Sequence, residues 1–173
     1  MKQRKFSILQ RKQLADRCFE KTFRSMQLLH YTVLYYDFDF SKDDIKKFNS
    51  NVNDYNNECL DDRATFLKSE ENILNEYGFS CEKAAKQFPL RAKLKIVCKV
   101  PNHDIALKNA EDAIEVCLVL FLHEFTKEWG KNGSDIALYW RCMKENAMNY
   151  ANGMTDEFVK QYFKDELDLD ITE

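Results

Sequence analysis

The nine residues IEVCLVLFL, from Ile114 to Leu122, contain a single charged side chain, Glu115. A helix that is apolar on almost every face has to be buried among other helices. Apolar residues continue at helical spacing on both sides, which predicts a long helix from about Asp104 to Trp129. The uninterrupted apolar run is only seven residues, too short to cross a bilayer. We therefore expect the central helix of a soluble protein that does not associate with membranes.

The rest of the chain also has the pattern of a helical protein. Only four glycines and two prolines occur in 173 residues, and they fall almost entirely between runs of apolar residues with a period of 3.6. Apolar residues make up 45% of the chain, enough for a sizeable core at this length. We predict an all-α protein, a single domain over residues 1–173 folded as a compact bundle of five or six helices. An acidic tail begins at about residue 165.

Capping residues mark the expected helix boundaries. One helix is predicted from after Ser7 to Tyr36, and the next begins at Ser41, where Asp43 and Asp44 complement the helix dipole. This second apolar stripe reaches Tyr77, with a break expected near residues 61–63, and Gly78 ends it. Ser80 is expected to cap a short helix that stops before Pro89, Ser134 a helix that ends at Asn152, and Thr155 a last helix.

Residues 90–100 support two alternatives. Their apolar and basic side chains alternate, which is typical of a strand, yet no other segment alternates convincingly and a single strand has no partner in this chain. A short helix is an equal alternative. The strand requires a homodimer in which two chains pair their strands.

Charge is divided into four blocks along the chain. Residues 1–36 carry a net charge of +6, residues 37–82 carry −7, residues 83–100 carry +6 and residues 101–173 carry −8. Such segregation can mark a surface that binds a partner. The basic candidates for such a surface are Arg4, Lys5, Arg11, Lys12, Arg91, Lys93, Lys95 and Lys99. The acidic candidates are Asp61, Asp62, Glu70 and Glu71.

The motif search predicts no catalytic residue, no metal site and no cofactor. His123 and Glu124 begin a zinc-protease helix motif, but Lys127 stands where the second histidine is required. The turn from Gly130 to Ser134 lacks the spacing of a phosphate-binding loop. The six cysteines form no C-x-x-C pair, so we expect reduced thiols in a cytoplasmic protein.

Two helix entries of the form aromatic-x-Phe-Ser occur, at residues 38–41 and 77–80, and the sequence around residues 49–57 is rich in asparagine, lysine and aspartate. With the lack of an enzyme motif, these features resemble small helical accessory proteins of phages and mobile elements of Gram-positive bacteria, some of which are anti-CRISPRs. The resemblance implies a non-enzymatic inhibitor, in the bacterial host cytoplasm, that binds a Cas9-type nuclease or its guide-RNA complex. It assigns no individual residue a role.

The charge blocks suggest two modes of binding. An inhibitor can present acidic helices as a mimic of DNA phosphates, or hold guide RNA or DNA through its basic blocks. The alternative function is a nucleic-acid-binding accessory or regulatory protein that uses the basic segments 1–24 and 83–99.

Overall fold

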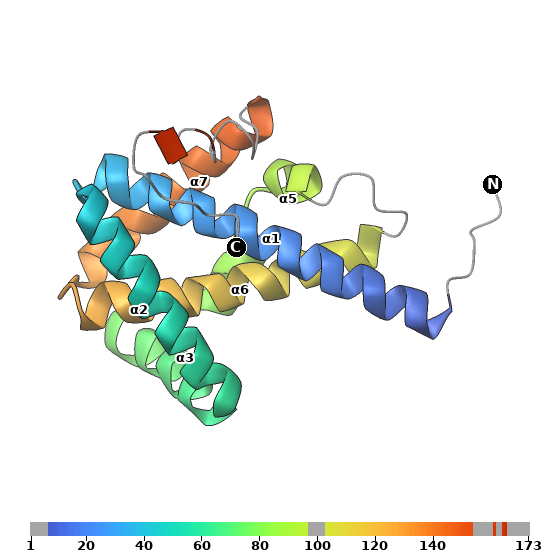
Figure 1. The fold of residues 1–173 in the computed structure, drawn as a ribbon, viewed down its shortest axis with the longest axis horizontal. Coiled ribbons are helices and arrows are strands. Elements are labelled where there is room, and N and C mark those ends of the chain that lie inside the picture. The colour runs from blue at the N-terminus through green and yellow to red at the C-terminus, as the bar shows by residue number, and fades with distance from the viewer. Residues whose placement is uncertain (1–6, 97–102, 154–160, 162–163, 166–173) are drawn as a thin grey trace.

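The computed structural model describes residues 7–96, 103–153, 161 and 164–165, and these ranges contain seven α-helices and no strand (Figure 1). In chain order the helices are α1 (Ile8–Asp37), α2 (Lys42–Asp61), α3 (Arg63–Tyr77), α4 (Cys81–Gln87), α5 (Leu90–Ile96), α6 (His103–Lys127) and α7 (Gly133–Asn152). The predicted all-α class is confirmed. The predicted number of five or six helices was too low. Within the described ranges, no helix is long and apolar enough to cross a membrane.

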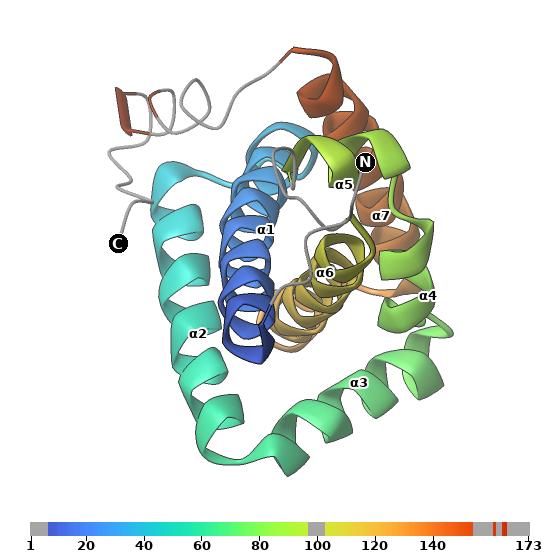
Figure 2. The same cartoon turned by 90° about the vertical axis from the view of Figure 1, so that its right-hand side faces the viewer.

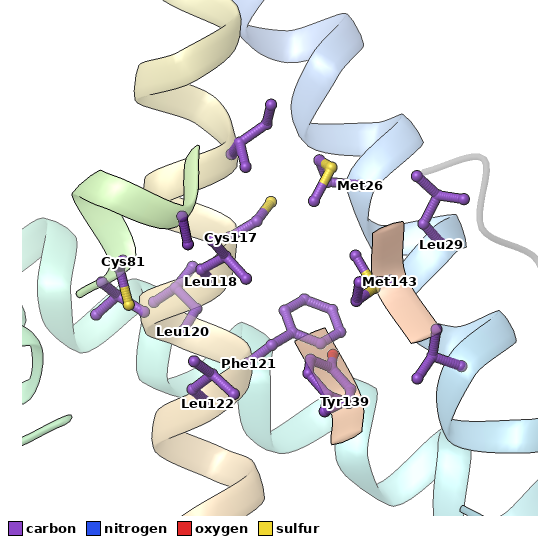
Figure 3. Close-up of a cluster of buried hydrophobic side chains, with 14 of the residues drawn as sticks. Met26, Leu29, Cys81, Cys117, Leu118, Leu120, Phe121, Leu122, Tyr139 and Met143 are labelled. Atoms are coloured by element: carbon purple, nitrogen blue, oxygen red, sulfur yellow. The ribbon is translucent and has the colours of Figure 1, made fainter. Parts of the chain in front are cut away.

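Helix α6 is the central element. It packs against α1, α2, α3, α4 and α5, and Figure 2 shows these helices arranged around it. Every residue from Cys117 to Leu122 is fully buried. In Figure 3, side chains of α6 lie among Met26 and Leu29 of α1, Met143 of α7 and Cys81 of α4. The prediction of a long central helix is therefore confirmed.

The predicted capping chemistry explains how α1 and α2 begin. Ser7 and Gln10 form a reciprocal capping box at the start of α1. Ser41 and Asp44 do the same at α2, where the Ser41 hydroxyl accepts from the Asp44 N–H at 3.2 Å. Short polar side chains at these positions satisfy backbone N–H groups that the helix leaves without partners.

Asp62 divides the second apolar stripe into two helices. Its backbone N–H donates to the carbonyl of Glu58 at 2.9 Å and so ends α2. Its carboxylate accepts from the Ala64 N–H, also at 2.9 Å, and so begins α3. Gly78 ends α3 with a φ of 67°, the left-handed conformation that glycine adopts most readily. The expected break and the expected end are both confirmed.

Residues 90–96 form helix α5, so the strand alternative was wrong for this part of the segment, and residues 97–100 lie outside the described ranges. Pro89 ends the preceding helix, and its carbonyl accepts from the Lys93 N–H at 3.1 Å, within the first turn of α5. Packing against α1, α6 and α7 buries Ala92 and Lys93. Tertiary contacts thus override the alternating pattern.

The start of α7 also differs from the prediction. Asn132, not Ser134, is its N-cap, because the Asn132 side chain accepts from the N–H groups of Ser134 and Asp135. The Asp135 carboxylate in turn accepts from the Asn132 N–H at 2.8 Å, completing a capping box. The predicted helix after Thr155 and the acidic tail fall largely outside the described residues.

The central position of α6 makes its apolar side chains the most sensitive to a buried charge. Replacing the fully buried Leu120 by Asp should cost at least ~3 kcal/mol and prevent folding, because the carboxylate would be buried in a cluster of apolar side chains. The matched control is Leu74→Asp at a site 47% exposed, which should change stability by less than ~1 kcal/mol. Far-UV circular dichroism and urea unfolding measure both. A Leu120→Asp protein with native helicity would contradict this fold.

Candidate binding surfaces

The predicted basic residues do not form one surface. Arg11 and Lys12 are exposed on the N-terminal part of α1, which extends past the other helices in Figure 1. Arg91 is exposed on α5. Arg4, Lys5 and Lys99, and the side chain of Lys95, lie outside the described part of the chain.

Lys93 is a buried structural residue, contrary to its predicted place on a binding surface. Only 3% of the residue is exposed. Its Nζ lies 2.6 Å from a carboxylate oxygen of Glu111 on α6 and donates to the carbonyl of Lys86 on α4 at 3.1 Å. The ammonium group therefore joins three helices and is not available to a phosphate. Alternation of lysines along the segment could not reveal this, because the partner carboxylate lies 18 residues away on another helix.

The acidic candidates are also divided. Asp61, Asp62 and Glu71 are exposed, and the Asp62 carboxylate is already engaged in capping α3. Glu70 is half-buried, and its carboxyl group shares a hydrogen bond with Glu115 of α6. Three of the four predicted acids thus face solvent, and the fourth faces the core helix.

The surroundings of Glu115 favour its protonated form, because they raise its pKa. Burial, then the hydrogen bond to Glu70 and the charges of Glu70, Glu82 and Asp112, together raise the pKa of Glu115 to about 7. Two neighbouring carboxylates cannot both ionise without repulsion. The pair therefore tightens the contact between α3 and α6 only while it is protonated.

Exposed leucines were not singled out from the sequence, yet they are prominent on the arm formed by residues 58–77. Leu60, Leu67 and Leu74 are 76%, 51% and 47% exposed. Leu67 and Leu74 share one face of α3, since seven residues are close to two helical turns. The seven-residue spacing of Leu67 and Leu74 is visible in the sequence and could have indicated this face. The arm also carries six acidic and two basic residues.

An apolar groove lies on the other side of the arm, between α1, α2, α3 and α6. Its volume is about 560 Å³. Half-buried side chains from four helices line it, among them Phe23, Phe66 and Val116, and Arg24 and Arg63 contribute guanidinium groups. Sequence periodicity assigned these aromatic residues to the core and gave no sign of a groove.

A polar cluster of Tyr55, Ser69 and His123 ties the arm to α6. The Ser69 hydroxyl lies 2.9 Å from Nδ1 of His123 and also bonds the hydroxyl of Tyr55, whose ring stacks on the imidazole with centroids 3.8 Å apart. Burial, followed by the charge of Lys127, lowers the pKa of His123 to about 4. With so low a pKa, the neutral imidazole of His123 is a weak general base. This favours a structural role for the contact between Ser69 and His123.

Comparisons of the chain with protein-family models, with curated proteins and with solved structures found no match. The interpretation of these surfaces therefore depends on their own chemistry.

The Glu70–Glu115 contact predicts a specific dependence of stability on pH. Because the pKa of Glu115 is raised from 4.5 to about 7, its contribution to folding is complete below pH 4.5 and is lost as the pH rises through 7. Glu115→Gln keeps a hydrogen-bonding group without the titration, so it should flatten the stability profile between these values. Thermal unfolding across this range measures the slope. The control is Glu71→Gln on the exposed side of α3, and a Glu115→Gln slope equal to that of wild type would contradict the shared proton.

Proposed function

We propose that this protein is a non-enzymatic inhibitor that binds a basic protein partner through the outer surface of the arm. The observation that carries the proposal is the exposure of Leu67 and Leu74 within an acidic segment. A surface of this composition can bury apolar anchors at the centre of an interface while its carboxylates meet lysines and arginines at the rim.

The charge of the arm favours one class of partner. Acidic residues outnumber basic ones by six to two, and Asp61 and Glu71 are exposed beside the leucines. A protein channel that binds nucleic acid is lined by positive charge. The arm would occupy such a channel as a mimic of phosphate charge, with the leucines adding contacts that a nucleic acid lacks.

The resemblance to small phage accessory proteins suggests the first partner to test. A Cas9-type nuclease has a positively charged channel for its heteroduplex and delegates sequence recognition to its guide RNA. An anti-CRISPR that blocked this channel would need no catalytic residue of its own. We therefore propose the nuclease or its guide-RNA complex as the partner, within the bacterial host cytoplasm.

The test compares arm variants in a Cas9 cleavage assay and in a binding assay with the nuclease–guide complex. Leu67→Ser combined with Leu74→Ser should weaken binding by about tenfold or more, because two apolar anchors are lost. Asp61→Asn combined with Glu71→Gln should weaken it in a salt-dependent manner. Leu9→Ser is the matched control, since Leu9 is 65% exposed on α1, away from the arm.

All variants should keep the wild-type unfolding midpoint within a few degrees. Inhibition that survives both arm variants would contradict a role for the arm. Failure of the wild-type protein to bind this nuclease would exclude the named partner, and the arm variants would then be tested by capture from bacterial lysate.

A nucleic-acid-binding protein is the second candidate function, and a specific observation favours it. Five basic residues are exposed on α1 between residues 11 and 24, namely Arg11, Lys12, Arg17, Lys21 and Arg24. Binding through this helix should fall steeply with salt, because each phosphate contact releases counterions. A gel shift that Arg11→Glu combined with Lys12→Glu abolishes would support this function. Lys93 is left unchanged in this test, because its reversal would oppose Glu111 in the core.

A further inference from the structure

The groove behind the arm has the dimensions of a short helix-binding site. It follows α1 from Phe19 to Gln27 and α2 from Asn53 to Leu60, which at 1.5 Å per residue gives a length of about 10–12 Å. A bound helix spans about 10 Å between an anchor at position i and one at i+7. Figure 2 shows α1, α2, α3 and α6, the four helices whose residues line the groove.

The lining supplies an apolar surface for such anchors. The rings of Phe19 and Phe23 lie nearly parallel, with centroids 6.1 Å apart, along α1. Phe66 and Val116 are half-buried, and Leu60 is the most exposed large apolar side chain among the described residues. Covering these exposed apolar side chains with a partner removes their surface from water, which is favourable.

The charges of the lining select the partner. The lining contains two guanidinium groups, those of Arg24 and Arg63, and one carboxylate, that of Glu20. The groove therefore has an excess of positive charge. Among the described residues, neither guanidinium takes part in an ion pair. Guanidinium groups bind carboxylates with two hydrogen bonds in a fixed geometry.

We propose that this groove binds a short amphipathic helix of a partner protein whose apolar residues are flanked by Asp or Glu. The site is separate from the outer surface of the arm, because Leu67 and Leu74 do not belong to the groove lining. The two surfaces have opposite charge preferences, since the arm selects a basic surface and the groove an acidic one. The protein can therefore engage two different segments at once.

The test uses the full chain and two labelled helical peptides with leucines at positions i, i+3 and i+7. One peptide carries glutamates beside the leucines, and the other carries lysines at the same positions. Fluorescence anisotropy should show binding of the glutamate peptide at least about tenfold tighter than that of the lysine peptide, from two exposed ion pairs. Arg24→Glu combined with Arg63→Glu should reverse this preference, and Leu60→Ser should weaken binding of the glutamate peptide.

The control separates this proposal from the proposed function, because Leu67→Ser combined with Leu74→Ser should leave peptide binding unchanged. Equal affinity for the two peptides, or no binding of either, would overturn the assignment. So would a dimer in sedimentation that Leu60→Ser dissociates, since a second copy would then cover the groove. Tighter peptide binding after removal of residues 165–173 would show that the chain's own acidic segment competes for the groove, and would also overturn assignment to a partner.

Discussion

The rest of the structure depends on the need to cover α6 on every side. From Cys117 to Leu122 this helix has no exposed residue, so each neighbouring helix has to supply apolar surface to a different face. Phe121 illustrates how α6 contacts several helices at once. Its ring centroid lies 4.1 Å from that of His30 on α1 and 5.5 Å from that of Phe48 on α2. Non-directional burial alone would permit many arrangements of those helices around α6.

Polar contacts restrict that freedom by joining the surrounding helices to particular positions of α6. Three such contacts each join one helix to a buried or half-buried side chain of α6. They are Asn51–Glu124 for α2, Ser69–His123 for α3 and Lys93–Glu111 for α5. Unpaired polar groups in these positions would be costly, so alternative registers of the helices are disfavoured. A role in specifying the arrangement accounts for polar residues that would otherwise suggest catalysis or nucleic-acid binding.

Most local features of the fold could be predicted from the sequence, although the N-cap of α7 was wrong, and the specific long-range contacts could not be predicted. Capping by Ser41, the break at Asp62 and the end at Gly78 depend on neighbouring residues, and all three were predicted. The burial of Lys93 depends on a carboxylate 18 residues away, and the contact of His30 with Tyr139 joins residues 109 apart. Periodicity carries no information on such pairs. Periodicity likewise identified the aromatic residues of the groove as apolar, but it did not show that they remain partly exposed to solvent.

The arm carries one proposed binding surface on its outer side and contributes part of the lining of the groove, and its inner polar contacts attach it to the central helix. Hydrogen exchange followed by mass spectrometry on the free protein tests this arrangement most directly. Amides of residues 114–125 in α6 should exchange only through global unfolding, whereas those of residues 63–77 in α3 should exchange through smaller local openings. Exchange in α6 as fast as in α3 would contradict the central position of α6 and the account built on it.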